Sequence, residues 1–116
     1  MTWLWLSAVL MLVTAVIHSV AGEKRIISPL LALGKAGIPS EQSRRVMRSA
    51  WHLTSAFMVT NAVIVVWPAS PTGLITVIAA FWLLVGLFSL FASHGRHVGW
   101  PTLVASGVAA LIGVYL

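Results

Sequence analysis

Cysteine is absent from the sequence, acidic residues number only two, and charged residues of both signs make up 8% of the 116 positions. Without cysteine the chain is not a disulfide-stapled secreted module. The low charge, together with a hydrophobic content of 59%, excludes a water-soluble enzyme and a disordered tail, because so short a soluble chain cannot bury that much apolar surface. The composition therefore predicts a single-domain integral membrane protein.

Four apolar runs predict an all-α fold, an integral membrane four-helix bundle that residues 1–116 form as one domain. An apolar run of about 20 residues at ~1.5 Å per residue reaches about 30 Å, the thickness of the hydrocarbon core. Gly22, Pro68, Pro71 and Gly95 lie at the ends of runs, where such residues stop or start helices. The expected spans cover about residues 2–21, 49–67, 72–93 and 101–116.

The first connection is long and is expected to be a cytoplasmic loop of about residues 22–46. Residues 28–33 are apolar and too few to span a membrane, which favours a short helix at the interface. Ser40 is a good N-cap, so the second long helix is expected to run from Glu41 to Trp67. Its first turns then lie outside the hydrocarbon, and Trp51 and Trp67 are expected to anchor the buried part at the two interfaces.

The basic residues determine the expected topology. Of the seven, six belong to the first connection and Arg96 to the third, so all of them fall on one side of the bundle. The positive-inside rule places that side in the cytoplasm, and both the N and C termini on the non-cytoplasmic side of the cell (inner) membrane. Membrane lipids are thus expected partners. Nucleic acid is not expected as a partner, because the basic residues lack the interleaved aromatics that stack bases.

The histidines are expected to gather on the cytoplasmic side. His18 lies one turn before the end of the first span, and His52 about one turn into the buried part of the second. His94 closes the third span, and His97 sits in the turn that follows. Because successive spans run in opposite directions, all four fall at one membrane depth, and Glu23 joins them from just past the first span. Ionisable groups at membrane depth are expensive, so this convergence indicates a functional site.

Four imidazoles and one carboxylate at the same height predict a transition-metal site. Neutral imidazole suits zinc, iron and copper, and a carboxylate can complete the coordination shell. On this hypothesis a metal-bound water or oxygen acts on a lipid-soluble or amphipathic substrate, with Glu23 as the catalytic base. The predicted metal ligands are His18, Glu23, His52, His94 and His97.

Other interpretations of the same histidines stay open. They fit interface residues that are hydrogen-bonded to the backbone or to headgroups. They also fit a small proton-linked carrier, channel or accessory subunit in which imidazoles titrate. A haem electron carrier is a third alternative, with two histidines on facing helices, for instance His52 and His94, as axial ligands. Haem is less favoured than a metal ion, because the middle of the membrane lacks histidine and a bare metal needs less space in so small a bundle.

Arginines surround the same region. Contact with anionic lipid headgroups is the favoured interpretation of Arg48 and Arg96. The alternative is a clamp for an anion or a phosphate beside the metal, because Arg48 lies one helical turn from His52.

Two patterns concern packing. On the first span, one helical face that includes His18 carries small or mildly polar residues and is expected to face the bundle interior: Ser7, Met11, Thr14 and Ala15. Asn61 is the only amide at mid-membrane, and Ala105, Ala109 and Gly113 recur every four residues on the last span. Both features are typical of close helix association, so a homo-oligomer is expected.

Overall fold

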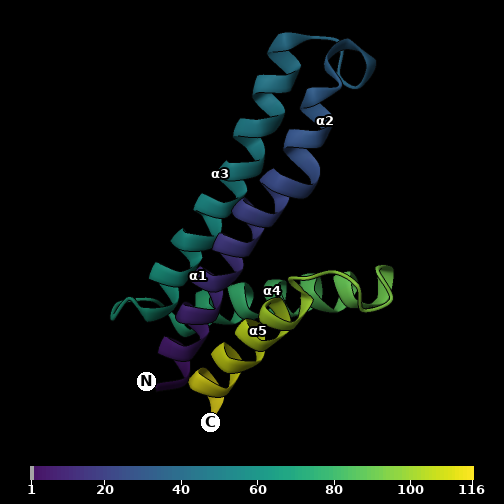
Figure 1. Cartoon of the computed structure of the whole chain (residues 1–116). Helices are drawn as coiled ribbons and strands as arrows, with labels where there is room; N and C mark the ends of the chain where they lie inside the picture. Colours follow the sequence, from purple (N-terminus) through teal and green to yellow (C-terminus); the bar gives the residue numbers. More distant parts are fainter. Residues whose placement is uncertain (1) are drawn as a thin grey trace.

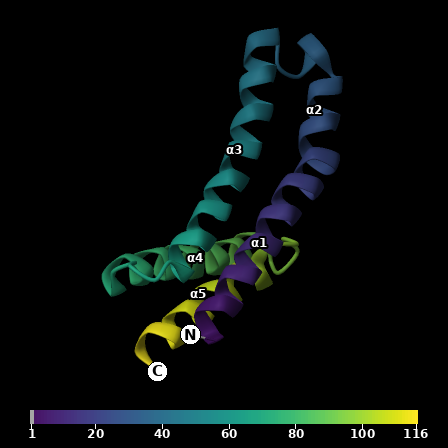
Figure 2. The same cartoon turned by 90° about the vertical axis from the view of Figure 1, so that its left-hand side faces the viewer.

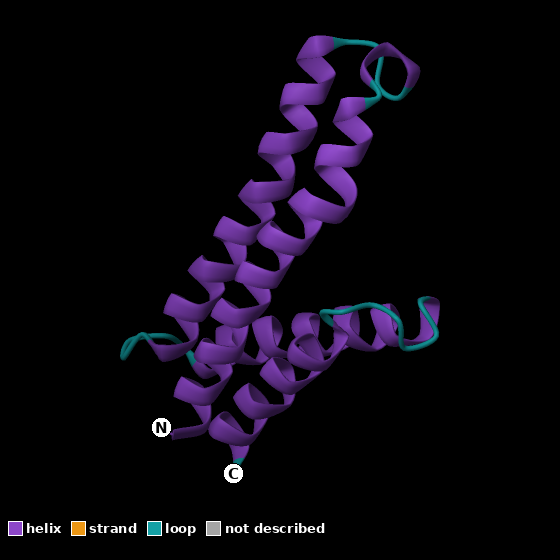
Figure 3. Cartoon of the chain, in the orientation of Figure 1, coloured by secondary structure: helices purple, strands orange, loops and turns teal. Residues whose placement is uncertain are grey.

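The computed structural model describes residues 2–116, and every regular element in that range is helical (Figure 3). The all-α prediction is therefore confirmed. In chain order the elements are α1 (Thr2–Gly22), the π-helical turn η1 (Glu23–Ile27), α2 (Ser28–Ala32), the 3-10 turn η2 (Gly34–Ala36), α3 (Glu41–Val66), α4 (Thr72–Ala92) and α5 (Trp100–Tyr115) (Figure 1).

Three helical segments of residues 2–116 are long and apolar enough to cross a membrane, and α5 is a shorter apolar helix. The long segments are α3, α4 and the continuous 31-residue stretch Thr2–Ala32, which joins α1, η1 and α2. This agrees with the expected membrane character of the chain. A helix of 31 residues reaches about 46 Å at ~1.5 Å per residue, well beyond the hydrocarbon thickness.

Gly22 does not end the first helix, although the sequence predicts a stop there. Its backbone is right-handed helical, with φ −63° and ψ −45°, and the chain continues through η1 into α2. The expected separate interfacial helix is thus an extension of α1. The physical reason for a glycine here is Trp51: a Cβ atom at Gly22 would overlap the indole ring. Gly22 makes room for a neighbouring helix instead of terminating its own.

Two helix ends match the sequence signals. The N–H of Ser43 donates to Ser40 Oγ at 3.2 Å, so Ser40 caps α3 as expected. At the end of α4, Gly95 adopts φ +81° and its N–H donates to the Leu90 carbonyl at 2.9 Å. That left-handed conformation is the one glycine adopts without strain after a helix.

The long helices form two hairpins, α1 with α3 and α4 with α5, and α5 also packs along α1. Figures 1 and 2 show that the hairpins meet near the chain termini and diverge away from them. Residues from all four long helices make the buried core, namely Ala8, Met11, Ala62, Val65, Ile75, Ile78, Ala79, Trp82, Leu103 and Ala110.

The contact between α1 and α5 uses the face of α1 that the sequence predicts to be internal. Ser7, Met11, Thr14 and Ala15 are all buried, which confirms that prediction. The hydroxyl of Ser7 donates to the carbonyl oxygen of Ser106 at 2.7 Å. The Thr14 hydroxyl donates to Thr102 Oγ1 at 2.7 Å. Small polar residues therefore hold the two helices close together.

The small residues of α5 pack within the chain. Ala109 is buried, and a Cβ atom at Gly113 would lie 2.8 Å from Leu4 Cδ2 on α1. A Cβ atom at Gly107 would lie 2.6 Å from the Ala79 carbonyl oxygen on α4. Ala109 and Gly113, two of the three small residues from which self-association was expected, therefore pack against other helices of the same chain. The homo-oligomer stays a prediction.

Charge is concentrated on the part of the α1–α3 hairpin that extends beyond the α4–α5 hairpin (Figures 1 and 2). Every Lys, Arg and Glu of the chain except Arg96 lies within residues 23–48. We call these residues the charged arm. The boundary between the apolar part of α1 and the charged arm, around residues 18–25, is where the polar side chains discussed next are found.

Candidate functional site

The last turns of α1 and the start of η1 present polar side chains on two different faces, and α3 contributes to both. His18 and Arg25 belong to one face, with Gly22 between them. Ser19 and Glu23 belong to the other. In a helix, residues four or seven positions apart share a face, so the spacing of each pair explains why its members lie together. Each face forms a separate candidate site.

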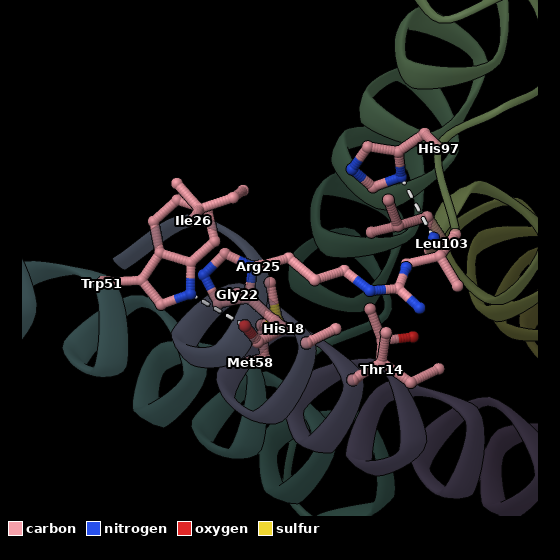
Figure 4. Close-up of a pocket in the computed structure, with 13 residues that line it drawn as sticks. Thr14, His18, Gly22, Arg25, Ile26, Trp51, Met58, His97 and Leu103 are labelled. Carbon is pink, nitrogen blue, oxygen red and sulfur yellow. Dashed lines mark hydrogen bonds between the residues drawn. The ribbon is translucent and has the colours of Figure 1, made fainter. Parts of the chain in front are cut away.

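The first site is a cavity of about 360 Å³ between the two hairpins (Figure 4), which we call the inter-hairpin cavity. Its walls come from α1, η1, α3, the turn of residues 93–99 and α5. Most of the lining is apolar, with Ile17, Ile26, Met58, Val98 and Leu103 as the larger side chains. The polar members are Thr14, His18, Arg25, Trp51 and His97.

His18 is held in the cavity wall by Trp51. The two rings stack with centroids 4.4 Å apart and an interplanar angle of 3°. The indole Nε1–H also donates to the backbone carbonyl of His18 at 2.8 Å. Trp51 thus packs between α1 and α3. Its expected role as an interface anchor stays a prediction.

One polar atom of the cavity wall is left unsatisfied. The Nε2 atom of His18 is buried and has no hydrogen-bond partner among residues 2–116. Buried polar atoms are nearly always hydrogen-bonded, and an unmade bond costs about 1–3 kcal/mol. The ring of His18 is thus enclosed beside the cavity with one nitrogen that lacks a partner among the described residues.

Arg25 and His97 face the cavity from opposite hairpins. Figure 4 shows the Arg25 side chain extending across the cavity from η1, with the His97 ring on the other side. No carboxylate of residues 2–116 forms an ion pair with Arg25. Nδ1 of His97 accepts the N–H of Gly99 at 3.1 Å, so the neutral ring carries its proton on Nε2 and is a donor there. The cavity therefore has two donors and no acid to pair with them.

The second site is centred on the carboxylate of Glu23. Its Oε1 accepts from Arg48 Nε at 3.0 Å and lies 3.1 Å from Nε2 of His52. Its Oε2 accepts from the hydroxyl of Ser28 at 2.7 Å. Glu23 is thus fixed from α2 and from two positions on α3. We call these residues, with Ser19 and Ser55, the Glu23 cluster.

The cluster continues from Glu23 toward the apolar part of the hairpin through the imidazole of His52. Nδ1 of His52 lies 3.0 Å from the Ser19 hydroxyl oxygen. The Ser19 hydroxyl donates in turn to Ser55 Oγ at 2.6 Å, and Ser55 is buried between the helices. A carboxylate, an imidazole and two hydroxyls are therefore joined in one hydrogen-bonded chain.

The predicted metal ligands are not brought together. In the described range, residues 2–116, no group of three or more His or Glu side chains is placed to hold a metal ion. Glu23 and His52 are in contact, and His18 and His97 line the inter-hairpin cavity. His94 stays apart in the exposed turn after α4, with φ +53°. The structure therefore gives the metal site no support.

Helix geometry explains this separation. His18 and Glu23 are five positions apart, which is about 140° around a helix of 3.6 residues per turn. They consequently face opposite sides of the α1–α3 contact, although they lie at similar depth. For the haem alternative, both ring nitrogens of His52 already contact Ser19 and Glu23, and neither is free for an axial bond.

The arginines chosen from the sequence differ in their surroundings. Arg48 pairs with Glu23, and its neighbours Arg44 and Arg45 line a surface hollow with it on the charged arm. Arg96 is exposed in the turn between α4 and α5. Contact of Arg48 and Arg96 with an anion or a headgroup stays a prediction.

Several residues of these sites were not singled out as site residues from the sequence, among them Ser19, Arg25 and Trp51. A usable signal existed for two of them. Ser19 precedes Glu23 by four positions, and Arg25 follows His18 by seven, so each shares a helical face with a predicted site residue. Polar residues at that spacing in an otherwise apolar chain indicate a common face.

Comparisons with protein-family models, with curated proteins and with solved structures find no match for this chain. What the protein does is therefore inferred from its own side chains.

Proposed function

We propose that the protein binds a lipid-soluble, amphipathic molecule with a negatively charged, hydrogen-bond-accepting head in the inter-hairpin cavity. The observation that carries this proposal is the Arg25 guanidinium, which extends across a mainly apolar cavity and has no ion pair with a carboxylate of residues 2–116 (Figure 4). A binding role of this kind suits a carrier, an accessory subunit or an enzyme that acts on a membrane-dissolved substrate.

The apolar part of the ligand is indicated by the walls and the size of the cavity. A volume of about 360 Å³ falls in the range of roughly 300–1,000 Å³ that is usual for small-molecule sites. Ile17, Met58 and Leu103 offer an apolar surface from both hairpins. A molecule dissolved in the membrane reaches such a cavity laterally, between the diverging hairpins.

The polar head is indicated by Arg25 and His97. The guanidinium of Arg25 has no acidic partner among residues 2–116 and can donate two parallel hydrogen bonds to the oxygens of a carboxylate or a phosphate. Nε2 of His97 is a further donor. A neutral, fully apolar ligand leaves both groups unpaired and is disfavoured.

Transition-metal binding and haem binding stay predictions from the sequence, which the arrangement of the described histidines does not support. Elemental analysis for zinc, iron and copper tests the first, and a Soret band in the absorption spectrum of the purified protein tests the second.

The binding proposal is tested with a fluorescent long-chain fatty acid and the protein in mild detergent. Arg25→Gln removes a charge-assisted bond worth about 1.5–3 kcal/mol, so the dissociation constant is expected to rise tenfold or more. Lys24→Gln is the matched control, because Lys24 is the adjacent cation and does not line the cavity. It is expected to change the affinity less than twofold. Absence of saturable binding, or equal losses in the two variants, contradicts the proposal. A fluorescent phosphate monoester of the same chain length separates a phosphate head from a carboxylate head.

A further inference from the structure

The Glu23 cluster contains a hydroxyl, an imidazole and a carboxylate in the order used by serine nucleophiles. Ser19 Oγ lies 3.0 Å from His52 Nδ1, and His52 Nε2 lies 3.1 Å from Glu23 Oε1. Both distances are within the range of about 2.6–3.2 Å in which a base activates a nucleophile and an acid orients the base. This site lies on the face of α1 that does not line the inter-hairpin cavity, and the inference below does not depend on the binding proposed there.

The carboxylate determines which ring nitrogen of His52 is basic. Arg48 and Ser28 donate to Glu23 and hold it as an ionised acceptor. An acceptor opposite Nε2 favours the tautomer with the proton on Nε2, which leaves the lone pair of Nδ1 directed at the Ser19 oxygen. The Ser19 hydrogen, which is donated to Ser55 Oγ in this structure, turns to Nδ1 for the reaction. The two ring nitrogens are exchanged relative to the Ser-His-Asp arrangement of proteases, but each residue has the same role.

A donor for a developing oxyanion lies next to Ser19. Ser55 Oγ accepts the hydrogen of the Ser19 hydroxyl at 2.6 Å, so its own hydrogen can turn toward an oxygen bound at the nucleophile. A preorganised donor of this kind stabilises the tetrahedral intermediate of acyl transfer. Ser19, Glu23, Lys24 and His52 line a mainly apolar surface hollow of about 290 Å³. The hollow is open to the outside, so a chain lying along the surface of the hairpin can enter it.

The position of Ser19 indicates the substrate class. Ser19 lies near the end of the apolar run of α1, and Glu23, Lys24 and the rest of the charged arm follow at once. In a bilayer the boundary between hydrocarbon and charged groups is where the ester groups of amphipathic lipids lie. We infer that Ser19 is a nucleophile, with His52 as its general base, for the hydrolysis of an acyl ester of an amphipathic lipid.

The reaction balances without any redox partner. Ser19 Oγ forms a bond to the acyl carbonyl carbon while its proton passes to Nδ1 of His52. The ester C–O bond then breaks, and the leaving alcohol takes that proton from His52. Water, which reaches the partly exposed Glu23 side, gives a proton to His52 and attacks the acyl-Ser19 ester. The bond between the acyl carbon and Ser19 Oγ then breaks, and His52 returns the proton to Ser19. The products are one carboxylic acid and one alcohol for each ester and water consumed.

The test is covalent labelling of the purified protein in lipid nanodiscs by a fluorescent fluorophosphonate, with the adduct located by mass spectrometry of peptides. A single adduct is expected on Ser19. Ser19→Ala abolishes it, and Ser49→Ala, a serine of α3 outside the cluster, leaves the rate unchanged. His52→Gln is expected to slow labelling roughly 100-fold or more, the usual contribution of a general base.

Further measurements on the same variants distinguish a loss of nucleophilic chemistry from misfolding and from the loss of a bound metal. Helical circular dichroism and thermal unfolding of Ser19→Ala and His52→Gln are expected to match the wild type closely, and a chelator is expected to leave labelling intact. Hydrolysis of a p-nitrophenyl ester of a long-chain acid is expected in the wild type and not in Ser19→Ala. Ser19→Ala keeps the fatty-acid affinity of the inter-hairpin cavity, so the two proposals fail independently. No adduct on Ser19, labelling unaffected by His52→Gln, loss of labelling with chelator, or no ester hydrolysis overturns the inference.

Discussion

Trp51 links the two polar sites at the scale of single residues. Its ring stacks on His18 in the wall of the inter-hairpin cavity, while the next residue, His52, contacts Glu23 on the other side. The indole occupies the space that a Cβ atom at Gly22 would need. The position of both sites along α3 consequently depends on the absence of a side chain at one position of α1.

Replacement of Gly22 by alanine is therefore expected to displace Trp51. The indole is a large ring held by a hydrogen bond and a stack, so it cannot move cheaply, and overpacking of this kind costs about 1–3 kcal/mol of folding free energy. Gly73→Ala is the matched control, because nothing lies within 4 Å of a Cβ atom there. It is expected to leave the stability unchanged or raise it slightly. Chemical unfolding in detergent measures both, and equal stability of the two variants contradicts the role given to Gly22.

At the scale of helices, periodicity predicts the buried face of α1 correctly. Ser7, Met11 and Thr14 are small or slender in an apolar run, and such residues are retained where two helices approach closely. The start of α3 is also correct, because an N-cap serine acts through its own next turn. A helix cap and the buried face of a helix depend on residues within one or two turns, so both can be predicted from the sequence alone.

The continuation of the helix after Gly22 could not be predicted in this way. A glycine after an apolar run is typical both of a helix end and of a close approach by another helix. The choice depends on Trp51, which is distant in the sequence. The candidate site shows the same limit. His18 and His97 line one cavity, and His52 contacts Glu23. The two pairs lie on different sides of α1, so they do not form a common centre.

Continuity of α1 into α2 makes a prediction for backbone amides. Residues 23–32 are helical, so their amide hydrogens are expected to exchange slowly with deuterium, although most of their side chains are polar or exposed. Residues 40–42 lie at the start of α3, before its first backbone hydrogen bond from the Arg44 N–H to the Ser40 carbonyl. Their amides are expected to exchange fast in the same sample, which provides an internal control. Hydrogen exchange with mass spectrometry in nanodiscs measures both segments. Fast exchange throughout residues 23–32 is the result that a loop predicts.

At the scale of the whole molecule, the divergence of the two hairpins creates the ligand site. The hairpins share a core near the termini and separate toward the charged arm (Figures 1 and 2). Polar residues therefore gather where the packing between hairpins ends, and His97 reaches the cavity from the turn after α4. The arrangement combines an apolar space, a lateral opening and unpaired donors, which are the properties that an amphipathic anion requires.

The most direct measurement of this claim locates a bound ligand. A long-chain fatty acid with a photoactivatable diazirine in its chain is bound to the protein in nanodiscs, irradiated, and its adducts are mapped. The account predicts adducts on cavity residues of both hairpins, such as Met58 of α3 and Leu103 of α5, and their loss in the presence of excess unlabelled acid. Adducts confined to exposed positions of α4 such as Phe81 and Phe88, or adducts that the unlabelled acid does not reduce, would contradict it.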